Sequence, residues 1–513
     1  MTTDGAARPV NPLFITAAVV LASMIQAIDT TIANVALPYM RGSLSASEDE
    51  INWVLTSYIT AAAIMTPPTG WLTARLGRRR MFLIAVVGFT LASVLCGMAE
   101  SLTQIVLFRI LQGVFGASLI PLAQAVIIDT YPPEKQGSAM SLWAMGVMVG
   151  PVLGPTLGGW LTENYDWRWV FFLNVPVGAA CLVLMWLFLP DTPKRETRFD
   201  WTGFATLSLG IGALQMMLDR GQEMDWFGST EILVEACLAG LGFYLFLAHS
   251  VTTKTPFINF AILRDRNYVA GLVFIFTISA VISSTMSLMT PFLQGLANYP
   301  VETAGLLMAP RGIGMIVAVL LTGRYLTKYD PRVICFLGFA IAAATLWDMT
   351  RWTADVSSAR MIWVSVFQGA GLGIAYISLQ PVIFVTLPRH LTTEATSFYS
   401  LFRNTGQSVA ISIVSALLVR NTQVNHASIS QAVTPFNRAL QQGAAAQFWN
   451  LHTTLGQSMI DETVTRQASI IAYIDNFKLV FLMTLCAMPV VLLIRVVKRK
   501  KQADEPAHAA AMD

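Results

Sequence analysis

Apolar windows long enough to cross a lipid bilayer follow one another along most of this chain. About 20 consecutive apolar residues span the hydrocarbon core as an α-helix, and such a segment must satisfy its own backbone hydrogen bonds because lipid offers none. Only 12% of the residues are charged, against about 25% in soluble domains. The sequence therefore predicts an all-α integral membrane protein with fourteen spans. We place these spans near residues 14–38, 52–73, 81–98, 104–127, 138–161, 170–189, 201–218, 230–250, 268–289, 303–322, 333–350, 361–385, 396–419 and 475–497.

Basic residues predict which side of the membrane each connection faces. Lys and Arg gather in the connections that are cytoplasmic if the N-terminus lies inside, among them Arg78–Arg80 and Lys498–Lys501. Because positively charged connections tend to stay in the cytoplasm, we expect both termini there. The first window lacks signal-peptide features and is expected to remain as a span. All five cysteines fall inside predicted spans, so no disulfides are expected.

One carboxylate, Asp29, stands in the middle of the first apolar window. An acid at the centre of a bilayer costs roughly 2.5 to 3.5 kcal/mol on insertion scales, so it should face a bundle interior or a water-filled cavity. Because such acids often carry protons in transporters, Asp29 is a candidate proton site.

Arg109 is a cation inside the fourth window, with no carboxylate within one helical turn. Its partner must come from another helix or from water. Asp29 is the obvious acid for a shared network, and we hypothesise that Arg109 tunes the proton affinity and water access of Asp29. The alternative is structural, with Arg109 joining helices through backbone carbonyls.

Glycines recur every four residues in the fifth window, at Gly146, Gly150, Gly154 and Gly158. A stripe without side chains lets a neighbouring backbone come close and can seal one side of a pathway. Pro151 and Pro155 each remove a helix hydrogen bond, so this segment should bend and could act as a closing element. Ordinary packing of small residues is the alternative.

The chain also repeats itself weakly. Gly70–Arg80 after the second window has a counterpart in Gly323–Arg332 after the tenth, and Gln112 has one in Gln368. Both pairs are offset by about 255 residues, as a duplicated bundle would produce. We therefore expect two six-helix bundles with two additional helices between them. The expected domains are 1–190 (first bundle), 191–267 (additional helices and cytoplasmic linker) and 268–513 (second bundle).

At these residues a family resemblance becomes specific, and it covers nearly the whole chain. Four strings resemble motifs of the major facilitator superfamily and of its fourteen-span drug:proton antiporters, and two more are similar to EmrB-type multidrug exporters. The strings are Gly70–Arg80 (loop signature), Arg109–Gly113 (fourth helix), Gly150–Gly159 (fifth helix of antiporters), Asp29–Pro38 (first helix), Leu218–Gly221 and Asp225–Phe227.

The resemblance implies a major facilitator fold in a bacterial inner membrane. It also implies efflux of hydrophobic or amphipathic drugs in exchange for protons, with Asp29 and Arg109 coupling the two. Gly70, Gly77 and Arg78 would be conformational parts, although the arginines of this loop also fit the bias of basic residues toward the cytoplasm. Ala74 stands where the family motif has an aspartate, which puts the usual latch between the halves in doubt.

Several other polar residues lie in or near the ends of predicted spans and are candidates for a substrate cavity. Each amide has hydrogen bonding between helices as its alternative, and each arginine has snorkelling to an interface. The arginines would make the lumen positive and suited to anionic or weakly acidic amphiphiles. The candidates are Gln26, Asn34, Gln112, Gln368, Arg311 and Arg403.

A long polar stretch, residues 420–474, separates the last two windows. Its composition predicts a pair of short amphipathic helices in a periplasmic loop, and at this length it is more than a connector. The resemblance to EmrB-type exporters implies that this loop docks a periplasmic adaptor (membrane-fusion) protein that leads to an outer-membrane channel. A lid or a passive loop is the alternative.

No catalytic set is evident in the sequence, which lacks a phosphate loop and a metal-ligand spacing and gives no support for nucleic-acid binding. We therefore expect a secondary transporter that is not an enzyme and needs no cofactor beyond a proton gradient, with sodium left open as the ion. The alternatives are export of one metabolite, such as a fatty acid, siderophore or amino acid, and a transporter-shaped receptor without turnover.

Overall fold

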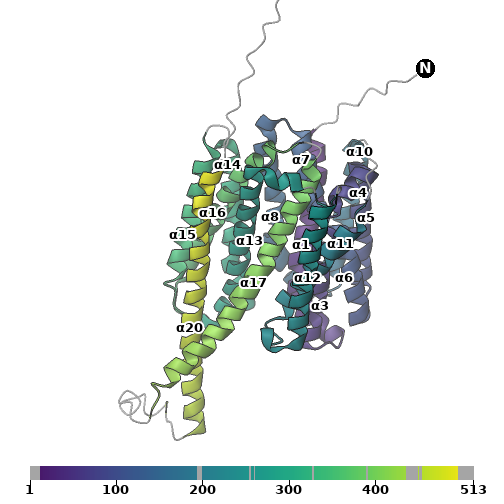
Figure 1. Ribbon diagram of the computed structural model, residues 1–513. Coiled ribbons are helices and arrows are strands. Elements are labelled where there is room, and N and C mark those ends of the chain that lie inside the picture. Colours follow the sequence, from purple (N-terminus) through teal and green to yellow (C-terminus); the bar gives the residue numbers. More distant parts are fainter. Residues whose placement is uncertain are drawn as a thin grey trace, which may run out of the picture.

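A computed structural model describes residues 12–192, 194, 199–253, 256–258, 260–325, 329–388, 391–434, 449 and 453–494. Throughout this part of the chain the regular structure is helical (Figure 1), which confirms the predicted all-α class. The first half contains α1 (Pro12–Ser43), α2 (Glu48–Ile51), α3 (Trp53–Met65), α4 (Thr69–Leu76), α5 (Arg78–Gly97), α6 (Leu102–Gly116), α7 (Leu119–Thr130), α8 (Pro133–Asn164), α9 (Trp169–Phe172) and α10 (Asn174–Phe188).

Two inserted helices separate this half from the second one. They are α11 (Trp201–Arg220) and α12 (Thr230–Thr252), with the short 3-10 helices η1 (Trp226–Gly228) and η2 (Phe260–Arg264) after each. The second half contains α13 (Arg266–Pro291), the π-helix η3 (Phe292–Leu296), α14 (Val301–Tyr325), α15 (Pro331–Met349), α16 (Ser358–Val385), α17 (Thr392–Ser430), α20 (Thr454–Ala487) and the 3-10 helix η5 (Met488–Leu493).

Polar side chains define where several of these helices begin. At α2, Ser47 and Glu50 form a capping box, in which each residue bonds the backbone N–H of the other. The bond from the Ser47 backbone lowers the pKa of Glu50 from its ordinary value. Asp265 caps α13 by accepting from the Tyr268 N–H. These caps satisfy donors that the first turn of a helix leaves free.

Among the described residues, eleven helices are long and apolar enough to cross a membrane. Three predicted windows are not among them: 52–73, which is divided between α3 and α4, 138–161 within α8, and 396–419 within α17. All three windows are largely helical in the structure. The count of fourteen spans therefore stays a prediction.

The internal repeat seen in the sequence has a counterpart in the packing. In the first half α1 packs on α8, while α6 packs on α3 and α5; in the second half α13 packs on α17, while α16 packs on α14 and α15. Corresponding helices thus meet corresponding neighbours. This is the arrangement expected of two bundles derived from one duplicated unit.

The two halves meet at the ends of helices that carry the repeated loops. There α4 and α7 contact α17, and α8 contacts α14 and α16. A Cβ added at Gly70 would lie 3.0 Å from the Glu394 Cα, and one added at Gly323 would overlap the Ser141 side chain. Gly70 and Gly323 are the repeat partners found in the sequence, and each lets one half touch the other.

The polar stretch before the last span differs from its prediction. The prediction of a pair of short helices in a loop over 420–474 is wrong at both ends of this range, because α17 continues to Ser430 and α20 already begins at Thr454. The two helices run side by side past the ends of the other helices (Figure 1), joined by a 3.0 Å contact between His426 Nε2 and Asp461 Oδ1. The prediction for residues 435–448 and 450–452 lies outside the described residues.

Candidate functional site

The site is built around α1, which carries Asp29 at mid-length. Close approach of α8 buries this part of α1: a Cβ at Gly150 would lie 2.5 Å from the Ala27 carbonyl carbon, and one at Gly154 would overlap the Thr31 hydroxyl. The Thr31 hydroxyl donates to the Gly150 carbonyl at 3.1 Å. The predicted glycine stripe thus brings two backbones together within the first half. Pro151 and Pro155 lie in the same uninterrupted helix.

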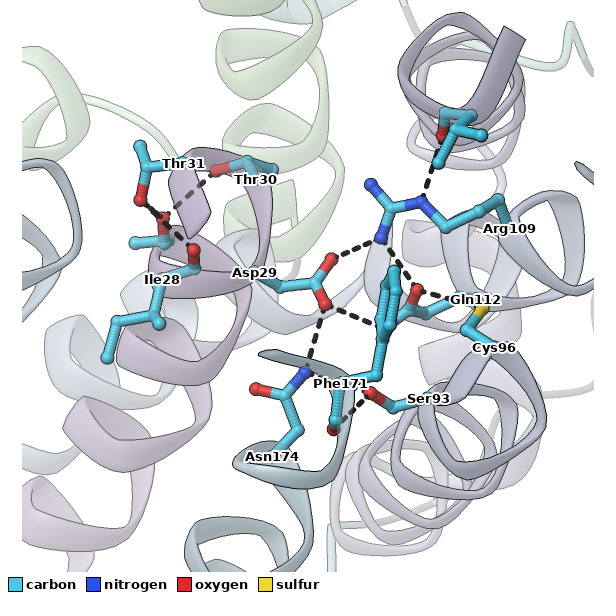
Figure 2. Close-up of polar contacts among 12 residues, drawn as sticks. Ile28, Asp29, Thr30, Thr31, Ser93, Cys96, Arg109, Gln112, Phe171 and Asn174 are labelled. Atoms are coloured by element: carbon cyan, nitrogen blue, oxygen red, sulfur yellow. Dashed lines mark hydrogen bonds and ion pairs between the residues drawn. The ribbon is translucent and has the colours of Figure 1, made fainter. Parts of the chain in front are cut away.

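Asp29 and Arg109 form an ion pair in the interior of the first half. Arg109 Nη1 lies 2.6 Å from Asp29 Oδ2, and both side chains are 0% exposed. The guanidinium comes from α6 and the carboxylate from α1, so the pair joins two helices (Figure 2). Arg109 therefore has the acid partner expected from the sequence. Whether the pair couples protons to transport stays a prediction.

The second carboxylate oxygen of Asp29 is held by two amides (Figure 2). The side-chain nitrogens of Gln112 and Asn174 each donate to Asp29 Oδ1 at 2.9 Å. Asn174 also donates to the Ser93 hydroxyl at 2.9 Å, and that hydroxyl donates to the Phe171 carbonyl at 2.8 Å. Side chains from α1, α5, α6 and α10 thus form one connected network.

Arg109 has further contacts that fix its guanidinium. Its Nε donates to the Val54 backbone carbonyl of α3 at 3.0 Å, and its Nη1 donates to the side-chain oxygen of Gln112 at 2.8 Å. The guanidinium lies 4.3 Å from the centre of the Tyr58 ring, within cation–π range. Its Nη2 and the Tyr58 hydroxyl are buried without a hydrogen-bond partner among the described residues. Hydrogen bonds at Nε and Nη1 therefore fix the cation, while Nη2 makes none within the described part of the chain.

The geometry of this ion pair bears on the predicted role of Asp29 and Arg109 in proton coupling. A buried ion pair repays its desolvation only through close geometry and added hydrogen bonds, and losing one partner costs about 3 to 5 kcal/mol. Protonation of Asp29 would cancel the charge that holds Arg109.

The remaining cavity candidates are distributed over both halves. Gln112 belongs to the Asp29 network, and the buried Gln26 side chain faces the Tyr58 hydroxyl. Asn34 is exposed. Gln368 is buried, and its nearest polar contact is the sulfur of Met349 at 3.7 Å. The structure therefore brings only Gln112 to the ion pair.

The two arginine candidates both lie in the second half. Arg311 makes one long bond, 3.5 Å to the Ile282 carbonyl, and Arg403 contacts the Asn404 side-chain oxygen at 3.4 Å. Neither is paired with a carboxylate among the described residues.

The conformational candidates gather where α4 turns into α5. Gly77 has φ +85°, a backbone conformation that favours glycine, and it separates the two helices. Arg78 pairs with Asp129 at 2.5 Å, so this arginine joins α5 to α7 within the first half. Gly70 contacts the second half at Glu394. Contact between the halves here thus forms without the aspartate that Ala74 replaces.

Sequence reasoning missed three members of the network: Tyr58, Ser93 and Asn174. Asn174 could have been found, because it is an isolated amide next to Phe171, Phe172 and Leu173, which is the type of signal that singled out Asp29. Tyr58 and Ser93 carry no such signal. Within the described residues no group of three or more His, Cys, Asp or Glu could hold a metal ion, and the five cysteines are free.

Comparison with known proteins places this geometry in context. Residues 19–411 match the Major Facilitator Superfamily. The chain is 35% identical to the fatty acid resistance protein FarB of Neisseria gonorrhoeae, over 94% of this chain and 96% of that protein. It is 33% identical to the multidrug export protein EmrB of Escherichia coli, over 91% and 92%. The crystal structure of the human organic anion transporter MFSD10 (TETRAN) has a similar fold, with a TM-score of 0.60, 12% identity and coverage of 92% and 99%.

Proposed function

Because the chain belongs to the major facilitator superfamily, we propose that it exports hydrophobic or amphipathic toxic compounds in exchange for protons. As a member of this superfamily it is a multi-pass membrane transporter and not an enzyme. The names of its relatives support the proposal, since they include multidrug export and fatty acid resistance proteins. The bacterial relatives favour the inner membrane as its location, and the basic connections favour cytoplasmic termini.

The observation that carries the proposal is the ion pair of Asp29 and Arg109. A proton from the extracytoplasmic side binds Asp29, and the pair separates because the carboxyl no longer carries the charge that holds Arg109. Return of the proton to the cytoplasm restores the pair. An ion gradient can drive transport only if one conformation holds the proton more tightly than the other. A carboxylate that has its cation in one state and lacks it in the other meets this requirement.

The contacts between the halves supply the alternating element. The glycine contacts at Gly70 and Gly323 hold the halves together at the ends that the predicted orientation places in the cytoplasm. Opening of the transporter toward the cytoplasm must break these glycine contacts. Gly70 and Gly323 both lie far along the chain from Asp29. The Asp29 network connects α1, α3, α5, α6 and α10, so a change in it is passed to most of the first half.

Drug-driven proton flux in proteoliposomes tests the proposal. We expect the wild-type protein to move protons when a lipophilic cation such as ethidium is added, and Asp29→Asn to lose this flux while still exchanging labelled for unlabelled ethidium. Asp348→Asn is the matched control, because Asp348 also pairs with an arginine, Arg360 at 2.6 Å, but is partly exposed. Undiminished proton flux in Asp29→Asn would exclude this acid as the carrier.

Export of anionic amphiphiles, such as fatty acids, is the second candidate function. Arg403 favours it, because its guanidinium has no carboxylate partner among the described residues and the Tyr376 hydroxyl faces it. A half-buried cation attracts an anionic headgroup. Arg403→Gln should reduce efflux of a long-chain fatty acid at least tenfold, about 1.4 kcal/mol, and leave ethidium efflux intact. Equal loss of both substrates would contradict an anion-selective role.

A tripartite assembly with an adaptor protein and an outer-membrane channel is also part of the proposal. The 39 residues of α17 span roughly 58 Å at 1.5 Å per residue, well beyond the ~30 Å hydrocarbon core. Together with α20 it offers a rigid helical surface outside the bilayer. Replacing residues 426–461 by a short Gly/Ser linker should abolish copurification with a candidate membrane-fusion protein while keeping transport in proteoliposomes. Unchanged recovery of the adaptor would count against docking.

A further inference from the structure

The inserted helix α11 has contacts with both halves of the transporter. It packs against α3 of the first half and α17 of the second, with α12 beside it. The polar residues at its carboxyl end lie level with the beginning of α3. In the predicted orientation this end faces away from the cytoplasm. When the halves separate on that side, the bonds from α11 to at least one of them must break.

Two hydrogen bonds join α11 to the second half. Gln215 Nε2 donates to the Ser408 hydroxyl at 2.9 Å, and the Ser412 hydroxyl donates to the Leu218 carbonyl at 2.6 Å. Gln215 and Ser412 are 6% exposed, so water competes little for these bonds. Polar bonds in such a buried setting are specific and costly to leave unmade.

The contact with the first half is formed by Asp219 and the turn after it. The Thr56 side chain of α3 faces the Asp219 carboxylate. Asn52 donates to Glu223 at 3.2 Å. A small cavity of about 20 Å³, large enough for one water molecule, is lined by Asn52, Trp53, Thr56, Asp219, Arg220 and Glu223.

Asp219 has no ion-pair partner within the described part of the chain. The next residue, Arg220, directs its guanidinium to Glu231 and to the Trp53 ring, and Glu223 adds a second negative charge. On α12, Glu231 and Glu235 face Arg220, while α3 and α17 present the neutral Thr56 and Ser408. Asp219 Oδ2 is buried without a hydrogen bond among the described residues.

Gln215 connects this acid to the second half. Its Nε2 donates both to Asp219 Oδ1 at 3.1 Å and to the Ser408 hydroxyl at 2.9 Å. An ionised carboxylate can only accept hydrogen bonds, so it fixes the amide with its NH₂ group toward Ser408. A protonated carboxyl carries no charge, so its hydrogen bond from Gln215 Nε2 is weaker, and the amide is held less firmly toward Ser408.

We propose that Asp219 is a second proton-responsive residue, which holds α11 to both halves when ionised and releases the second half when protonated. We call Thr56, Gln215, Asp219, Ser408 and Ser412 the α11 clasp. The clasp rests on the proposed transport function, because in it protons on the extracytoplasmic side open the transport path toward that same side. Asp219 acts here as a positioning residue that senses acid, while Asp29 carries the transported proton.

Hydrogen–deuterium exchange of the full-length protein in detergent tests the clasp without substrate or gradient. After correction for intrinsic rates, amides near Gln215–Arg220 and Ser408–Ser412 should exchange about tenfold faster at about pH 5.5 than at about pH 8, the size expected for losing one or two net hydrogen bonds. Asp219→Asn should exchange at the fast rate at both pH values. Asp219→Glu should restore the dependence on pH.

Glu223→Gln is the matched control, because it removes the neighbouring carboxylate and should keep the pH dependence of the wild type. Ser408→Ala removes the hydroxyl on α17 that accepts from Gln215, so it should also give fast exchange at both pH values. The proposal is overturned if the wild type shows no pH dependence at these amides, if Asp219→Asn keeps it, or if Glu223→Gln loses it. Size-exclusion profiles identify variants that fail to fold.

The clasp and the proposed transport function can fail independently in these experiments. If Asp29→Asn keeps proton flux, the coupling proposal fails, whereas exchange at the clasp is measured independently. If the clasp is correct, Asp219→Asn should retain drug-driven proton flux and shift its dependence on extracytoplasmic pH. Complete loss of flux in folded Asp219→Asn would assign it a carrier role and overturn its role as a positioning residue.

Discussion

Replacing Arg109 by methionine tests how the buried ion pair is balanced. In Arg109→Met the carboxylate of Asp29 stays fully buried and loses a cation at 2.6 Å, and the Val54 carbonyl loses its donor at 3.0 Å. Removing one partner of such a pair costs about 3 to 5 kcal/mol. Because a protonated acid has no charge to bury, this loss of stability should be smaller at acidic pH than at neutral pH.

The double variant Asp29→Asn with Arg109→Met supplies the comparison. It leaves no charge in the site, and an amide at position 29 can keep hydrogen bonds to Gln112 and Asn174. We expect it to be destabilised by only about 1 to 2 kcal/mol. The double variant should therefore be more stable than Arg109→Met although it carries one more substitution.

Denaturant unfolding of the detergent-solubilised proteins, followed by tryptophan fluorescence, measures these free energies. Proton flux should be absent in both variants. The reasoning is refuted if Arg109→Met is as stable as the wild type at neutral pH, or if the double variant is less stable than Arg109→Met. Either result would mean that the charge of Asp29 is compensated by groups other than Arg109.

Two further predictions concern glycines at close contacts. Gly154→Val should destabilise the protein by about 1 to 3 kcal/mol in the same unfolding assay, because the new side chain would overlap Thr31. Gly159→Ala is the control and should have little effect, because its Cβ would lie in open space. Equal effects of the two substitutions would contradict the close contact between α1 and α8. Gly70→Leu should separate α4 from Glu394 and so increase the reaction of cysteine side chains with a thiol reagent added on the cytoplasmic side. Unchanged labelling would show that the contact between Gly70 and Glu394 does not close the transport path.

Local sequence patterns were sufficient for the class of the protein. Apolar windows predict membrane helices because lipid forces each segment to satisfy its own backbone, and this requirement acts residue by residue. Asp29 and Arg109 stood out for the same reason, since a charge in an apolar window must have a partner. The polar stretch 420–474 was misjudged because composition distinguishes aqueous from lipid surroundings but does not end a helix: α17 and α20 simply continue into it.

The tertiary structure decided which of these residues meet. Ser93 and Asn174 complete the Asp29 site from α5 and α10, and no spacing along the chain encodes that contact. Asp219 lies inside the string Leu218–Gly221, and only packing places it between Thr56 of α3 and Gln215, which bonds the second half. Whether a segment lies in lipid or in water determines its composition and periodicity, so these features can be predicted from the sequence of that segment alone. Partner choice depends on how separate helices cross, which only the folded bundle fixes.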